Sequence, residues 1–204
     1  MDEIELDNTK DVKIILLGEN GVGKTSIINR YITNQFNPDF QNVTLGSNYF
    51  TKEIKNNRVN YRLKIWDTNG QDKFHSVMKL FIQGSNIILL VYSIDSKESF
   101  ENLDFWYNTM KSSLDGKNYI FAIIANKTDL KDNVVVSDEK GKIYAKEKNS
   151  MFKKISAKED GIGIDDLFNK LIDELRKTNF EVNSSIVLTK THFKKKKKHE
   201  KKDC

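Results

Sequence analysis

The sequence predicts an α/β domain in three layers, in which a central, mostly parallel sheet of six strands carries helices on both faces. The pattern of apolar residues predicts the fold class, and the length of the chain predicts the number of domains. Short apolar runs alternate along the chain with stretches whose apolar residues recur at helical spacing. The chain of 204 residues is long enough for one domain with a sizeable core and only marginally long enough for two. We therefore expect a single domain.

Six segments are expected to form strands, because each is short, rich in β-branched or aromatic residues and bounded by polar residues. They are residues 12–17, 47–55, 59–67, 87–93, 119–125 and 151–155. The sequence NNR joins the second segment to the third, which favours a β-hairpin there.

Four segments have the apolar spacing of helices, namely residues 24–33, 96–113, 137–148 and 164–177. Asp95 and Glu98 are spaced as a capping box at the start of the second segment. The fourth carries Leu167, Leu171 and Leu175 four residues apart, which gives it one apolar face. We expect this segment to end the folded domain.

The periodicity divides the chain into an N-terminal extension, residues 1–10, a folded domain, residues 11–177, and a flexible polybasic tail, residues 178–204. The last eleven residues hold seven lysines and two acidic residues, which equals the whole net charge of +5. The rest of the chain is formally neutral, whereas a folded nucleic-acid-binding domain is expected to carry its own basic face. No nucleic-acid partner is therefore expected.

The termini and the cysteine content predict a cytosolic protein, unless a lipid is attached to it. The N-terminus lacks the basic start and apolar stretch of a secretory signal, and the apolar runs are too short to cross a bilayer. The single cysteine, Cys204, leaves no disulfide framework within the chain.

The sequence GENGVGKT, from Gly18 to Thr25, fits the pattern G-x-x-x-x-G-K-[ST] between the first expected strand and a helix. Its glycines let backbone N–H groups approach phosphate oxygens, Lys24 adds a positive charge, and the Thr25 hydroxyl can ligate Mg²⁺. This motif predicts a P-loop NTPase fold. The expected nucleotide contacts are Asn20, Gly21, Val22, Gly23, Lys24, Thr25 and Ser26.

The sequence NKTD follows a strand that is expected to be buried. The carboxylate of Asp129 can accept hydrogen bonds from the N1 and exocyclic amino groups that guanine presents and adenine does not. Asn126 and Lys127 are expected to support the base and the loop. The predicted nucleotide is therefore GTP or GDP.

With these motifs in this order, residues 11–177 resemble the small GTPases of the Ras superfamily, most closely the Rab family. WDTNGQD, residues 66–72, stands where the family has W-D-T-A-G-Q-E. Ser156, Ala157 and Lys158 form the sequence SAK, whose backbone contacts the guanine oxygen in the family. The resemblance therefore implies the small GTPase form of the P-loop fold.

The similarity to the Rab family rests on spacing. Residues 66–84 match the Rab stretch from W-D-T-A-G-Q to Y-Y-R-G without a gap, and VYSIDSKESFENLDFW resembles V-Y-D-I-T-x-x-x-S-F with its downstream tryptophan. The resemblance implies that Phe36 packs against the base. It also implies that effector proteins bind the aromatic side chains of Tyr49, Trp66 and Phe81.

The family resemblance implies a GTP/GDP switch with slow hydrolysis, in which Lys24 stabilises the phosphates. Gly70 would contact the γ-phosphate, and Gln71 would orient the attacking water. Mg²⁺ would be held by Thr25, Asp67 and, in the GTP state, Thr44.

The resemblance also implies partners for a monomeric switch: an exchange factor, a GTPase-activating protein, a GDP-dissociation inhibitor or escort protein, and effectors. A prenyl group on Cys204 beside the lysine run would supply the two signals that stable binding to an anionic membrane needs. The expected location is the cytosolic face of an intracellular membrane, with cycling through the cytosol. The expected role is the regulation of vesicle traffic.

Departures from the family pattern leave two alternatives open. Asn69 replaces the alanine of D-T-A-G-Q, Asp72 replaces the glutamate, and the span from Phe36 to Thr44 is one residue longer than in the family. The chain also ends in a lone cysteine, whereas Rab proteins usually end in paired cysteines or C-a-a-X. The alternatives are a GTP-binding scaffold with impaired hydrolysis, and a nuclear or nucleic-acid-associated GTPase that uses the basic tail.

Overall fold

The computed structural model describes residues 5–37, 47–68, 75–114, 116, 118–178 and 184–189. Its strands are β1 (Glu5–Leu17), β2 (Ser47–Asn56), β3 (Val59–Thr68), β4 (Ile87–Ser93), β5 (Ile120–Asn126), β6 (Met151–Lys154) and β7 (Ser184–Thr189). Its helices are α1 (Lys24–Thr33), α2 (His75–Ile82), α3 (Lys97–Glu101), α4 (Leu103–Ser113), α5 (Asp138–Glu147) and α6 (Gly161–Lys177), with a 3-10 turn at Lys131–Asn133.

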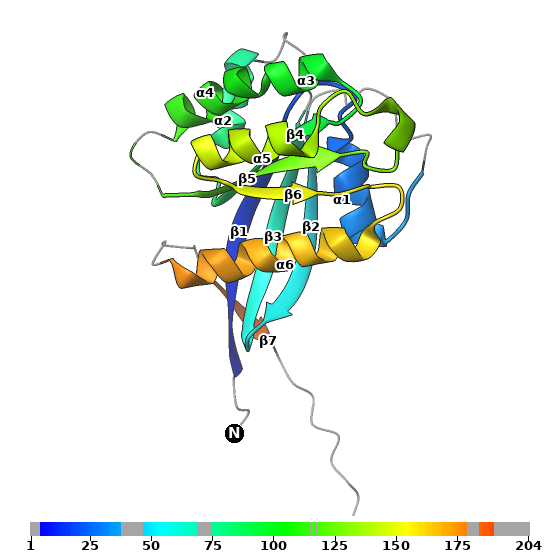
Figure 1. Cartoon of the computed structure of the whole chain (residues 1–204). Coiled ribbons are helices and arrows are strands. Elements are labelled where there is room, and N and C mark those ends of the chain that lie inside the picture. Colours follow the sequence, from blue (N-terminus) through cyan, green and yellow to red (C-terminus); the bar gives the residue numbers. More distant parts are fainter. Residues whose placement is uncertain are drawn as a thin grey trace, which may run out of the picture.

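The strands form one twisted sheet in the order β2-β3-β1-β4-β5-β6 (Figure 1). β1 is parallel to β3 and β4, β5 is parallel to β4 and β6, and only β2 on this path is antiparallel to its neighbour, β3. This six-stranded path with helices on both faces confirms the predicted fold class. Because the parallel strands run in one direction, their carboxyl ends meet at a single edge of the sheet.

Two hydrophobic cores lie on opposite faces of the sheet. Ile14 and Leu16 of β1 pack in the core that contains α1 and α6, whereas Ile15 and Leu17 pack in the core that contains α2, α4 and α5. The side chains alternate because successive residues of a strand point to opposite faces. β4 is buried along its whole length, as expected for a central strand covered on both sides.

The two ends of the chain differ from the sequence-based expectation. β1 begins at Glu5 and pairs antiparallel with β7, from Glu5↔Thr189 to Lys10↔Ser184. Residues 5–10 and 184–189 were expected to lie outside the sheet, the first in the N-terminal extension and the second in the flexible tail. Such pairing uses backbone hydrogen bonds, which need no apolar period in the sequence. Figure 1 shows β7 beside β1 at the end of the sheet that projects beyond α6.

The helices also differ in detail. The expected helix 96–113 is divided at Asn102 into α3 and α4, and α2 was not expected. The expected capping box is wrong, because the hydroxyl of Ser96, and not the carboxylate of Asp95, accepts the backbone N–H of Ser99. Ser96 has the extended backbone that an N-cap residue requires.

None of the helices among the described residues is long and apolar enough to cross a membrane.

An aromatic stack joins the two helices that cover one face of the sheet. Tyr31 of α1 and Phe168 of α6 stack with ring centroids 3.7 Å apart and an interplanar angle of 6°. The ammonium of Lys52, from β2, lies 3.7 Å from the centroid of the Tyr31 ring. Three elements, α1, β2 and α6, therefore meet at one buried aromatic pair.

Replacing Phe168 by alanine is expected to lower the free energy of unfolding by about 3–5 kcal/mol, because it removes a fully buried ring and leaves a cavity. Urea denaturation followed by circular dichroism measures this loss. Ile162→Ala, on the same helix but 81% exposed, is the control and is expected to change stability by about 0.5 kcal/mol at most. Equal losses in the two variants would contradict this assignment of the core.

Candidate functional site

The loop between β1 and α1 is shaped by its glycines. Gly18 and Gly23 have φ angles of 142° and 95°, which residues with a side chain rarely adopt. A Cβ atom at Gly18 would lie 2.1 Å from the carbonyl oxygen of Val91, and one at Gly23 would lie 2.3 Å from Nδ2 of Asn126. Both glycines of the motif therefore allow the loop to pass close to its neighbours, at the N-terminus of a helix whose dipole favours anions.

Lys24 lies at the start of α1 and is almost completely buried. Its Nζ atom donates hydrogen bonds of 2.8 Å to the carbonyl oxygens of Gly18 and Glu19. Burial lowers the pKa of Lys24 to about 8, although the negative charges of Asp67 and Glu19 oppose this shift. An anionic ligand beside Nζ would raise the pKa again, so the site favours a phosphate group over a neutral ligand.

A hydroxyl and a carboxylate face each other next to this lysine. Thr25 donates from Oγ1 to Oδ2 of Asp67 at 2.6 Å, and Asp67 is fully buried at the carboxyl end of β3. The following residue, Thr68, is fixed by a 2.6 Å hydrogen bond from its Oγ1 to the carbonyl oxygen of Leu16. Hydroxyl and carboxylate oxygens are the ligands that Mg²⁺ prefers, so this pair fits that ion.

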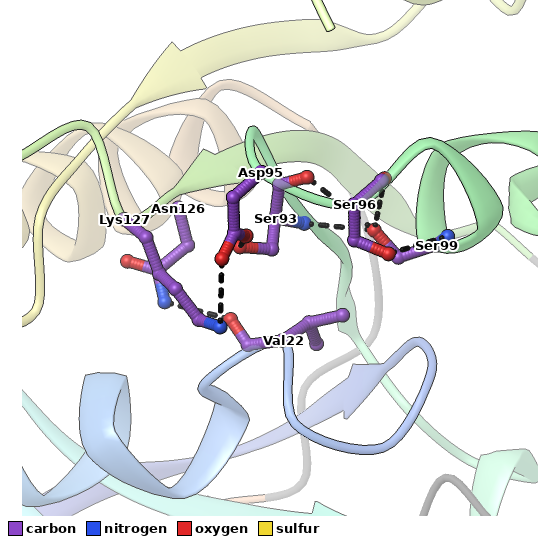
Figure 2. Close-up of polar contacts among 7 residues, drawn as sticks. All are labelled: Val22, Ser93, Asp95, Ser96, Ser99, Asn126 and Lys127. Atoms are coloured by element: carbon purple, nitrogen blue, oxygen red, sulfur yellow. Dashed lines mark hydrogen bonds and ion pairs between the residues drawn. The ribbon is translucent and has the colours of Figure 1, made fainter. Parts of the chain in front are cut away.

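Asn126 connects the glycine-rich loop to the SAK loop. Its Nδ2 atom donates to the carbonyl oxygen of Val22 at 2.8 Å, and its Oδ1 accepts from the backbone N–H of Ala157 at 3.2 Å. The side chain is 1% exposed, and Figure 2 shows it reaching from the end of β5 towards Val22. One buried amide therefore holds together three segments that are distant in sequence.

The other residues of the NKTD loop are also held by side chains. Ser156 donates from Oγ to Oδ1 of Asp129 at 2.6 Å. Lys127 has a left-handed backbone with φ of 63°, and its Nζ atom lies 3.6 Å from Oδ2 of Asp95. Asp95 is in turn hydrogen-bonded by the Ser93 hydroxyl (Figure 2). Asp95 was not expected at this site, because its position in the sequence pointed only to a helix cap.

Arg30 is a second residue that no motif indicated. Its guanidinium donates to the carbonyl oxygens of Ala157 at 2.8 Å, Asn34 at 3.1 Å and Lys158. Arg30 lies on α1, so one side chain attaches the SAK loop to the helix that begins at the glycine-rich loop. Only the three-dimensional arrangement reveals this contact, because 127 residues separate Arg30 from Ala157.

Most of the predicted contact residues in the described part of the chain belong to these three loops. Phe36 is half-buried beyond the end of α1. Four of the predicted site residues lie outside the described residues, namely Thr44, Gly70, Gln71 and Cys204. Asn69 and Asp72, which depart from the family pattern, also lie outside them.

The three aromatic residues expected to bind effectors lie next to one another. The ring centroids of Tyr49 and Trp66 are 5.2 Å apart, and those of Trp66 and Phe81 are 5.6 Å apart. The ammonium of Lys13 lies 5.3 Å from the centroid of a Trp66 ring. Tyr49 is 48% exposed, so part of this aromatic group is accessible from solvent.

Comparison with known proteins identifies the family. Residues 13–177 match the model of the Ras family. The chain is 38% identical over 163 residues to the Ras-related protein RABG3b of Arabidopsis thaliana, which covers 77% of the chain and 79% of that protein. It is 34% identical over 176 residues to Ras-related protein Rab7 of Pisum sativum, with 83% and 84% covered.

A third relative, Ras-related protein Rab-17 of Mus musculus, is 35% identical over 175 residues, which are 85% of the chain and 79% of that protein. These similarities do not favour a scaffold or a nuclear GTPase. The chain belongs to the Ras family and is a Rab-like small GTPase, an enzyme that hydrolyses GTP and takes part in membrane traffic.

Proposed function

We propose that the protein works as a GTP/GDP switch whose nucleotide lies between the glycine-rich loop, the NKTD loop and the SAK loop. The observation that carries this proposal is the buried Asn126 amide, which bonds to both Val22 and Ala157. It fixes the distance between a phosphate-binding loop and a base-binding loop. A nucleoside phosphate needs both at a defined separation.

The phosphates would be bound by Lys24 and by the backbone N–H groups of residues 20–26, namely Asn20, Gly21, Val22, Gly23, Lys24, Thr25 and Ser26. Thr25 and Asp67 would hold Mg²⁺, which offsets the charge of the phosphates when it is bound. Their buried, mutually facing oxygens support this role. Thr44, outside the described residues, would join them in the GTP state.

The guanine base would be recognised by the carboxylate of Asp129, whose orientation is supported by Ser156. The backbone of Ala157 and Lys158 would contact the guanine oxygen, and Arg30 holds that backbone in place. The side chains of Lys127 and Phe36 would then flank the base.

Hydrolysis would depend on Gln71, which orients the water, and on Gly70, which contacts the γ-phosphate; both lie outside the described residues. A GTPase-activating protein, an exchange factor and a GDP-dissociation inhibitor or escort protein would control the cycle. Effectors would bind the aromatic group of Tyr49, Trp66 and Phe81, whose mutual contacts support a common surface.

The proposed location is the cytosolic face of an intracellular membrane. The folded part, which includes the paired strands β1 and β7, would be tethered there by the residues that follow Thr189, with a prenyl group on Cys204 and lysines that attract anionic lipids. One lipid chain alone gives only marginal binding, which is why both parts of the tail are needed.

Asp129→Asn tests the base site. The carboxylate has two oxygens that accept hydrogen bonds, whereas the amide has one such oxygen and an NH₂ group that donates. GDP affinity is expected to fall by about 100-fold or more, while affinity for xanthosine diphosphate, which carries a carbonyl in place of the amino group, rises. Competition against a fluorescent GDP measures both. Asp132→Asn, in the exposed 3-10 turn, is the control, and an unchanged preference in Asp129→Asn would refute the assignment.

The tail is tested with two variants of the full chain. Cys204→Ser is expected to leave the protein in the cytosol, and the mass of the native protein is expected to include a prenyl group on Cys204. Replacing the five lysines 194–198 by alanine should keep the prenyl group but weaken binding to vesicles containing phosphatidylserine by about tenfold or more. Membrane binding of Cys204→Ser at the wild-type level would exclude the lipid anchor.

A further inference from the structure

The carboxylate of Glu19 is bound by a residue of α4. Glu19 is the second residue of the glycine-rich loop, and its Oε1 accepts a 3.0 Å hydrogen bond from Nε1 of Trp106. Trp106 is completely buried, so its indole cannot leave this position without disturbing the core. Eighty-seven positions separate the two residues, and no sequence motif connects them.

This contact determines on which side of the sheet the carboxylate lies. Trp106 belongs to the core that also contains Leu17, on the face covered by α2, α4 and α5. Val22 and Ile27 belong to the core on the opposite face, with α1. The Glu19 carboxylate is therefore directed to the α4 side, whereas the phosphate-binding helix terminus lies on the α1 side.

A carboxylate within a phosphate-binding loop is unfavourable unless its position is controlled. Its negative charge repels phosphate groups, and it attracts the same ammonium, that of Lys24, which the phosphates need. The indole N–H is a neutral donor that satisfies the carboxylate without bringing another charge into the site. In a partly buried site such a bond is stronger than in water.

We propose that Trp106 is a positioning residue for the nucleotide, because its indole N–H holds the Glu19 carboxylate on the α4 side of the loop. Lys24 and the backbone N–H groups of the loop can then bind the phosphates. The inference rests on the nucleotide site proposed above and adds to it a residue from outside the nucleotide-binding loops.

Trp106→Phe keeps an aromatic ring but removes the donor. GDP affinity, measured by displacement of a fluorescent GDP with Mg²⁺ present, is expected to fall about tenfold, with a smaller loss for GMP, which brings less charge to the loop. Adding Glu19→Gln removes the repelling charge and should restore GDP affinity to within about threefold of wild type. Tyr107→Phe, which removes a hydroxyl group from the neighbouring residue on α4, is the control and should bind GDP like wild type.

Rescue by Glu19→Gln separates positioning from mere packing. If Trp106 had only a structural role, Trp106→Phe would lower the affinities for GDP and GMP equally, and adding Glu19→Gln would not restore them. Either result would overturn the proposal. An unchanged GDP affinity of Trp106→Phe would overturn it as well. If Trp106→Phe does not fold, benzothienylalanine at position 106 preserves the ring shape with sulfur in place of N–H and is subject to the same criteria. Failure of the wild-type chain to bind GDP would refute the proposed nucleotide site instead.

Discussion

The structure depends on one buried side-chain amide, that of Asn126. Its donor and acceptor bond to two loops that are far apart in sequence, at Val22 and Ala157. The amide is shielded from water, so losing either partner would cost about 1–3 kcal/mol for the unsatisfied group. Gly23 is part of the same constraint, because a Cβ atom there would lie 2.3 Å from the amide nitrogen. A side chain at position 23 would therefore displace the Asn126 amide.

The sheet explains why these residues meet. β1, β3 and β5 run in the same direction, so Gly18, Asp67 and Asn126 lie at the same edge although they are far apart in sequence. Ligands of open α/β sheets bind at this edge, outside the carboxyl ends of the strands. The alternating burial along β1 then places α1 on one face and α4 on the other, which gives the glycine-rich loop a helix on each side.

Much of this could be predicted from the sequence, because the signals are local. Apolar runs located the six main strands, and glycine spacing located the loop before α1. The contacts made by Arg30 and Trp106 could not be predicted, since they join residues 127 and 87 positions apart and leave no pattern in either segment. The pairing of β7 with β1 was missed for a similar reason, because backbone hydrogen bonds carry no side-chain signature.

The most direct test of the account is the rate at which GDP dissociates from an Asn126→Ala variant. Removing the amide breaks its bonds to the phosphate loop and to the SAK loop, and leaves the carbonyl of Val22 and the N–H of Ala157 without that partner. GDP is expected to dissociate at least about 100-fold faster than from the wild type, corresponding to about 3 kcal/mol. A wild-type rate in a variant that remains folded would contradict the claim that this amide holds the nucleotide site together.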